Sequence, residues 1–169
     1  MNKVYLSVGS NKGNRLDYLS KANKLIRQRI GNIIKESSIY ETEPWGFMSD
    51  DLFLNQVVIA DSPHSPTDIL NEVKSIEKFI GRNQIPTKEY TSRVIDIDLL
   101  FYNDLIFESQ HLIIPHLHLH KRNFVLVPLC EISPEFIHPV FQIELGQLLM
   151  ICPDMSHVNI YHKTEYANK

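Results

Sequence analysis

Residues 90–105, YTSRVIDIDLLFYNDL, alternate apolar and polar side chains in the way that a β-strand does. Neighbouring side chains of a strand point to opposite faces, so Asp96 and Asp98 share one face, their stems about 6.6 Å apart after two rises of ~3.3 Å. The opposite face carries Ile95, Ile97 and Leu99. Two carboxylates side by side repel each other, and their burial without partners is costly. The segment therefore predicts a central strand that passes through a charged site.

The segments before this strand predict the rest of a sheet. Residues 3–8 are strand-like, and residues 16–30 carry apolar residues at helical spacing before Gly31. Two further strand-like segments, 33–42 and 52–61, are joined by a polar loop, and a capped helix is expected over 65–81.

This β-α-β-β-α-β order predicts an α+β fold with a ferredoxin-like core, in which two helices cover one face of an antiparallel sheet. We expect the other face to be free for a ligand. The rest of the chain is a C-terminal extension, with a loop and apolar segment at 112–129 and a last helix at 143–151.

Composition restricts the class of protein. The chain has 169 residues, which suits a single domain over 1–169, and 43% hydrophobic with 22% charged residues is typical of a soluble globular protein. The formal charge of −3 gives no broad attraction to nucleic acid or an anionic membrane. We see no signal peptide, no apolar run of the ~18 residues that span a bilayer, and no disulfide or zinc pattern in Cys130 and Cys152. We therefore expect a monomer in the cytoplasm.

The paired aspartates suggest a divalent cation. Mg²⁺ commonly takes one or two carboxylates and completes its shell with water and phosphate oxygens, so Asp96 and Asp98 are candidate metal ligands. The alternative for an isolated pair is a set of salt bridges with Lys or Arg. Cationic candidates surround the pair, and arginines suit forked contacts with phosphate. They are Arg82 and Arg93 upstream, and His116 and Arg122 downstream.

The sequence HLHLH at 116–120 allows a second kind of metal site. His116, His118 and His120 would share one face of an extended segment, as in a transition-metal site. Pro115 and the lack of Cys, Asp or Glu nearby favour instead a loop in which one histidine contacts a phosphate.

Aromatic residues suggest a place for a flat heterocycle. Phe53 and Phe124 could stack on its two faces while the Asn55 amide, which both donates and accepts, contacts its edge. The alternative is that both phenylalanines belong to the core.

Together these segments resemble the 6-hydroxymethyl-7,8-dihydropterin pyrophosphokinase family. The resemblance runs in order from Val4 to about Pro139 and rests on GSN, YETEPWG, FLNQVV, IEKFIGR, SRVIDIDLLFY and IPHLHLHKRNFVLVPLCEISPE. It implies a kinase of folate biosynthesis that transfers the diphosphate of ATP to the hydroxymethyl group of the pterin and releases AMP. Two Mg²⁺ ions are expected with ATP.

The resemblance also implies roles for individual residues. Asp96 and Asp98 match the magnesium-binding aspartates, and Arg82 and Arg93 match loop arginines implicated in the transfer. The positions that hold the pterin are Thr42, Pro44, Phe53, Asn55 and Phe124. The positions that handle ATP are Glu77, His116 and Arg122. Gly9, Ser10 and Asn11 match a first-loop signature that we interpret as structural support.

The chain departs from the family in the loop RNQIPTKEYTSR at 82–93. The family has an Arg-rich loop that ends in Trp-Gly-Pro-Arg. Here Tyr90, Thr91 and Ser92 stand before Arg93, and Gln84 lies near the place of a second arginine. These changes bear on loop geometry and rate rather than on the reaction type.

Two other functions use a similar framework. A nucleotidyltransferase can place the same pair of aspartates on a ferredoxin-like sheet, but it releases pyrophosphate instead of AMP. An RNA-binding module of the same topology needs exposed aromatics and a basic face, which the net charge and the acidic strand oppose.

Overall fold

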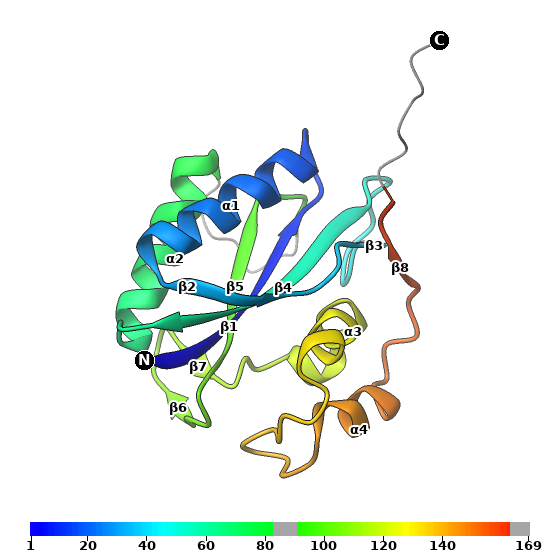
Figure 1. Cartoon of the computed structure of the whole chain (residues 1–169). Helices are drawn as coiled ribbons and strands as arrows, with labels where there is room; N and C mark the ends of the chain where they lie inside the picture. The colour runs from blue at the N-terminus through cyan, green and yellow to red at the C-terminus, as the bar shows by residue number, and fades with distance from the viewer. Residues whose placement is uncertain (83–90, 163–169) are drawn as a thin grey trace.

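The computed structural model describes residues 1–82 and 91–162. Its main element is an antiparallel sheet with the order β5-β1-β4-β3-β8, in which β2 also pairs with β4 (Figure 1). The strands of this sheet are β1 (Asn2–Ser10), β2 (Asn32–Glu36), β3 (Tyr40–Thr42), β4 (Phe53–Ser62), β5 (Asp96–Tyr102) and β8 (Val158–Ile160). A separate small sheet pairs β6 (Phe107–Glu108) with β7 (Ile113–Ile114). The predicted α+β class is confirmed.

The helices form a layer on each side of the sheet (Figure 1). They are α1 (Arg15–Arg29), α2 (Pro66–Ile80), the 3-10 turn η1 (Leu119–Lys121), α3 (Asn123–Ile132) and α4 (Leu145–Met150). The cap predicted for the second helix is confirmed, because the Ser65 side chain accepts from Asp68 N, and α1 is capped in the same way by Asn14, whose side chain accepts from Asp17 N. Gly81 ends α2 with φ 122°, a conformation that glycine adopts readily. No helix in the described ranges has the length and apolar character needed to cross a membrane.

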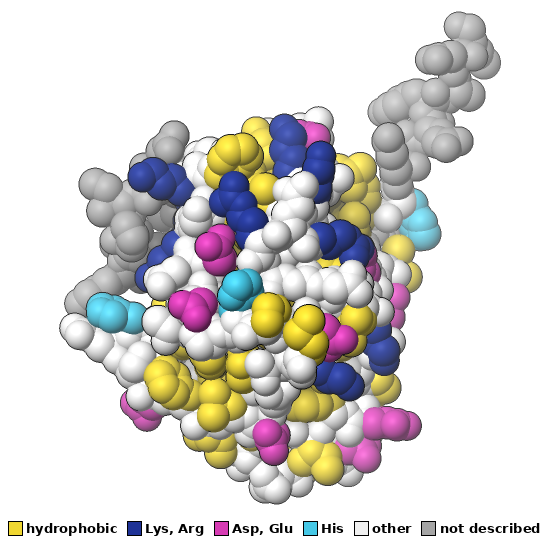
Figure 2. Space-filling model, turned by 60° about the vertical axis from the view of Figure 1, so that its left-hand side comes forward, with side chains coloured by type: hydrophobic (Ala, Val, Ile, Leu, Met, Phe, Trp, Pro, Cys, Tyr) yellow, Lys and Arg dark blue, Asp and Glu magenta, His cyan; other side chains and the backbone are white. Residues whose placement is uncertain are grey.

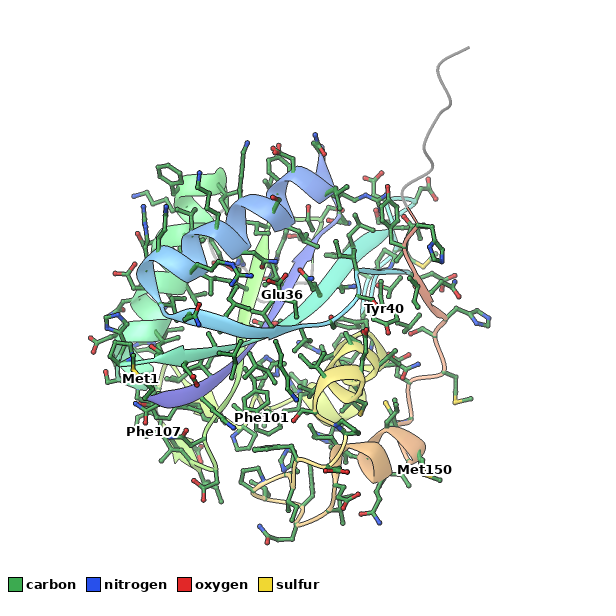
Figure 3. The ribbon with its side chains drawn as sticks, in the orientation of Figure 1. Met1, Glu36, Tyr40, Phe101, Phe107 and Met150 are labelled. Atoms are coloured by element: carbon green, nitrogen blue, oxygen red, sulfur yellow. The ribbon has the colours of Figure 1, made fainter. Side chains whose placement is uncertain are left out.

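Two hydrophobic cores lie on opposite faces of the sheet. The first packs β-strand residues such as Leu6 and Ile97 against α1 and α2. In the second, Phe101 points from β5 into the layer that contains Leu126 of α3 (Figure 3). The expectation of a free second face is therefore wrong over most of the sheet, because α3 and α4 bury it. The end of the sheet near Asp96 and Asp98 opens onto a cavity.

Two predicted elements also differ in detail. Residues 33–42 form two strands instead of one, because the Ser37 hydroxyl accepts from Val57 N at 3.0 Å and the chain turns away before β3. Part of the expected loop and apolar segment is α3, whose Val125, Leu126 and Leu129 are buried against the sheet. Packing of these residues against the sheet stabilises the segment as a helix.

Gly31 is a point of close contact between the end of α1 and β4. A Cβ atom at this position would lie 2.2 Å from the Asp61 carbonyl oxygen, a backbone atom that can move only with the strand. We expect Gly31→Ala to lower the free energy of unfolding by about 1–3 kcal/mol or more. Gly146→Ala, whose Cβ would meet nothing nearer than 3.6 Å, is the matched control. Equal urea midpoints for the two variants would contradict this packing.

Candidate active site

A cavity of about 160 Å³ lies at the end of β1, β4 and β5, under the loop that joins β3 to β4. It brings together most of the residues predicted from sequence. Those on its wall are Thr42, Phe53, Asn55, Arg93, Asp96, Asp98, His116, Arg122 and Phe124. The cavity therefore has a charged end, made of aspartates and cations, and an aromatic end.

Pairing with β1 fixes the two aspartates. Asp96 lies opposite Gly9 and Asp98 lies opposite Ser7 in the β1–β5 ladder. Both carboxylates line the cavity, whereas Ile97 between them is buried in the core under the helices. The strand interpretation of this segment is confirmed, including the face on which each side chain lies.

Arginines compensate the charge of Asp96. Arg82 Nη1 and Arg93 Nη1 each lie 2.8 Å from the same oxygen, Asp96 Oδ1. Arg82 also donates to Glu77 Oε1, which accepts a second hydrogen bond, from Ile97 N, at 2.8 Å. In the ligand-free protein, the salt-bridge alternative thus describes Asp96.

Asp98 is less well compensated. Its Oδ2 lies 3.7 Å from Arg122 Nη1 and 4.0 Å from His116 Nε2. Burial, followed by repulsion from Asp96, raises the pKa of Asp98, while Arg122 opposes the shift. The ionised form of Asp98 is therefore costly until another cation approaches it.

His116 is neutral in this environment. Burial and the nearby Arg122 lower the pKa of its imidazole to about 4. Its Nδ1 accepts from His118 N at 3.2 Å, so the ring proton is on Nε2, the atom that faces Asp98. His116 can thus donate a hydrogen bond into the charged end without adding a positive charge.

The aromatic end contains a buried amide. Asn55 is 3% exposed, and its Nδ2 donates to Thr42 Oγ1 at 2.7 Å. Gly9 allows this arrangement, because a Cβ there would lie 2.7 Å from Asn55 Oδ1. Phe53 and Phe124 both line the cavity, and Phe124 also packs against the second core, so the core alternative holds in part for Phe124.

Sequence reasoning missed two aromatic residues, Trp45 and Phe47, which also line the cavity. The Phe47 ring packs edge-on against Phe53, with 6.2 Å between centroids. Both residues belong to the polar loop 43–51, and aromatic side chains in such a loop were the available signal.

Three predicted residues lie off the cavity wall. Glu77 is 7% exposed and sits behind Asp96, joined to it through Arg82. Arg82 is not on the wall itself but is bonded to Asp96, which is. Pro44 lies in the chain between the lining residues Glu43 and Trp45. Direct contacts of Glu77 and Arg82 with ATP, and of Pro44 with the pterin, stay predictions. Gln84 and Tyr90 lie outside the described residues.

Asn11 of the first-loop signature joins two loops. Its Oδ1 accepts from Arg93 N at 2.7 Å, and its Nδ2 donates to Ser92 Oγ at 3.0 Å and to Asp51 O at 3.3 Å. These bonds hold the segment before β5 against the β3–β4 loop, as expected for a structural role.

The three histidines of HLHLH do not converge. The 3-10 turn η1 interrupts the extended segment, so His120 packs against Phe141 with 4.9 Å between ring centroids, away from His116. Over residues 1–82 and 91–162 there is no group of three or more His, Cys, Asp or Glu that could hold a metal ion. The described residues therefore do not form the three-histidine site of the transition-metal interpretation.

A family model described as 7,8-dihydro-6-hydroxymethylpterin-pyrophosphokinase matches residues 5–134. The chain belongs to this family. A pyrophosphokinase of Aquifex aeolicus is 39% identical over 142 residues, covering 84% of this chain and 87% of that protein. One from Porphyromonas gingivalis is 42% identical over 138 residues, covering 80% of this chain and 93% of that protein.

Longer proteins also contain a matching part. The folic acid synthesis protein fol1 of Schizosaccharomyces pombe is 39% identical over 170 residues, which cover 99% of this chain and 22% of that protein. The crystal structure of Plasmodium falciparum HPPK-DHPS with pteroate has a TM-score of 0.74 at 17% identity, covering 88% of this chain and 44% of that one. This chain thus spans less than half of the solved protein, and the likeness supports the ferredoxin-like pyrophosphokinase fold.

Glu77 should make the stability of this pyrophosphokinase depend on pH. Burial and Asp96 raise the pKa of Glu77 from 4.5 to about 7. The folded state therefore binds the Glu77 proton more tightly than the unfolded state does. The stabilisation that this proton gives is fully present below about pH 4.5 and is lost as the pH rises through 7. Glu77→Gln cannot lose a proton. Between pH 5 and 8 we expect the unfolding free energy of Glu77→Gln to increase relative to that of wild type by on the order of 1–3 kcal/mol.

Urea unfolding of both proteins without divalent cations measures this difference. Asp98 gives a slope of the same sign, and comparison of wild type with Glu77→Gln cancels most of that contribution. Parallel pH profiles would show that Glu77 does not titrate in this range.

Proposed function

We propose that this cavity holds both substrates of the family reaction. The chain transfers the diphosphate of ATP to 6-hydroxymethyl-7,8-dihydropterin and gives AMP, a step of folate biosynthesis. One observation carries the assignment to this site: a single cavity joins a charged end, with Asp96, Asp98 and Arg122, to an aromatic end with the buried Asn55 amide. The first end suits a polyphosphate and the second a flat heterocycle.

The donor set at the charged end fits magnesium. Asp96 and Asp98 would supply oxygen ligands from one face of β5, and the burial that raises the pKa of Asp98 disfavours its charge unless a further cation is near, which supports a metal here. A site with one or two carboxylates, completed by water and phosphate oxygens, is typical of Mg²⁺ that also binds phosphates. When bound, Mg²⁺ would neutralise the ATP phosphates and polarise the phosphorus under attack. Two such ions with ATP form part of the proposal.

The side chains at the charged end have separate tasks. Arg93 and Arg122 would donate to phosphate oxygens, and the neutral His116 would donate from Nε2. Arg82 lies just outside the wall and would approach when the phosphates draw it from Asp96. Because little covalent chemistry is left to the protein, positioning and charge stabilisation by these residues account for the transfer.

The pterin end predicts the effect of Asn55→Ala. The amide is buried and already held by Thr42, so its Oδ1 and its second N–H would contact the edge of the heterocycle without losing rotamer freedom. We expect pterin binding to weaken by roughly 1–3 kcal/mol in free energy, with ATP affinity nearly unchanged. Gly9→Ala, which pushes Asn55 aside, should act in the same direction. Calorimetry that shows equal losses for both ligands would contradict this assignment.

Product analysis tests the proposed function. Wild-type protein with ATP, Mg²⁺ and the hydroxymethyl-dihydropterin should form AMP, and chromatography separates AMP from ADP and pyrophosphate. Release of pyrophosphate would instead favour the nucleotidyltransferase.

The RNA-binding alternative has little support on the face in Figure 2, where side chains of both charge signs are interspersed.

A further inference from the structure

Trp45 connects the two ends of the cavity. It lies on the cavity wall in the loop between β3 and β4. The Cζ atom of Arg122 lies 4.7 Å from the centroid of its ring. The centroids of His118 and Phe124 are each 6.5 Å from the Trp45 centroid. The indole therefore stands between the aromatic end and a cation of the charged end.

Arg122 is the cation whose orientation matters most here. Its side chain is buried, and Nη1 faces Asp98 Oδ2 at 3.7 Å. A guanidinium can cover an aromatic ring with its flat face while its edge donates hydrogen bonds. Such a contact is stronger when water is excluded, as it is around Arg122. The Cζ atom of Arg122 also lies 5.8 Å from the centroid of Phe124, so the guanidinium packs against two aromatic rings, of which Trp45 is the nearer, while Nη1 faces Asp98.

We propose that Trp45 is a positioning residue for ATP, which acts by holding Arg122 in the plane that meets the phosphates. The position of the β3–β4 loop then affects the binding of ATP as well as that of the pterin. The identity of the anion rests on the proposed function, whereas the Trp45–Arg122 contact belongs to the ligand-free protein.

The contact itself can be tested without substrates. Trp45 is the one tryptophan of the chain, so fluorescence excited at a wavelength that tyrosine does not absorb reports on this ring alone. Arg122→Ala should uncover a face of the indole, shifting its emission to longer wavelength and raising acrylamide quenching. Lys121→Ala is the matched control, because Lys121 is the neighbouring residue in the chain, carries the same charge and has an exposed side chain.

The fluorescence test needs a folded variant. Far-UV circular dichroism checks this, and if Arg122→Ala does not fold, Arg122→Lys keeps the charge but lacks the planar face. Emission and quenching that match those of wild type in the folded Arg122 variant would overturn the proposal. A change of the same size in Lys121→Ala would overturn it too, because the effect would not be specific to Arg122.

Steady-state kinetics test the positioning role. Trp45→Leu should raise the KM for ATP about tenfold, the loss expected for a desolvated cation–π contact. Trp45→Phe keeps an aromatic face and should recover most of the affinity. A rise in the KM for the pterin alone, or an equal loss in both variants, would show that the indole is only a wall of the pterin site. If wild type forms no AMP, the proposed function fails while the fluorescence result still decides the contact.

Discussion

Asp98→Asn should leave the ligand-free protein at least as stable as wild type while lowering AMP formation by orders of magnitude. The charge of Asp98 is disfavoured by burial and by Asp96, and its contacts with Arg122 and His116 are long. Asparagine keeps the shape and removes that repulsion. In the presence of ATP the same change weakens the metal-binding carboxylate pair, where most of the charge stabilisation lies.

Asp96→Asn is the matched control for stability. It removes the charge that both Arg82 and Arg93 contact at 2.8 Å, so it should destabilise the ligand-free protein by about 1–3 kcal/mol. Both variants should be nearly inactive. Thermal unfolding without metal, compared with AMP production in saturating Mg²⁺, measures the two effects separately. An Asp98→Asn protein that is clearly destabilised yet nearly fully active would contradict a metal site at this residue.

Arg82→Ala should lower the rate of transfer by on the order of 10²-fold, with a smaller effect on ATP affinity. Arg82 is bonded to Glu77 and Asp96 in the ligand-free protein, so little of its interaction with ATP exists before the phosphates draw it over. Its positive charge therefore stabilises the transition state of the transfer more than the bound substrates. Rapid-quench single turnovers measure the rate apart from binding.

The variant also needs a stability control. Arg82→Ala leaves the buried Glu77 carboxylate without one of its partners, so Glu77→Gln combined with Arg82→Ala should restore stability but not the rate. Single turnovers at the wild-type rate, with only weaker ATP affinity, would show that Arg82 is a binding residue.

The strand with Asp96 and Asp98 could be predicted because its two-residue period is unbroken between Ile95 and Leu99. The α3 helix could not. Its segment NFVLVPLCEI is apolar at most positions and contains Pro128, so periodicity does not separate a helix from an irregular segment. Because α3 covers the second face of the sheet, the covering of that face could not be predicted either.

The members of the site were easier to predict than their contacts. Motif order gave Arg82 and Arg93 as cations near the aspartates, but it did not show that both reach the same oxygen of Asp96. Glu77 could be placed on α2, yet its burial depends on how α2 packs on β5. Trp45 was missed because a loop residue finds its partner, Arg122, only in the folded chain.

The most direct test of the central claim is a ³¹P NMR time course of wild-type protein with ATP, Mg²⁺ and 6-hydroxymethyl-7,8-dihydropterin. If the cavity joins the two substrates as proposed, AMP and a pterin diphosphate ester should appear in equal amounts as ATP disappears, and neither should form without the pterin. Formation of ADP or free pyrophosphate in place of AMP, or consumption of ATP that does not depend on the pterin, would contradict the account.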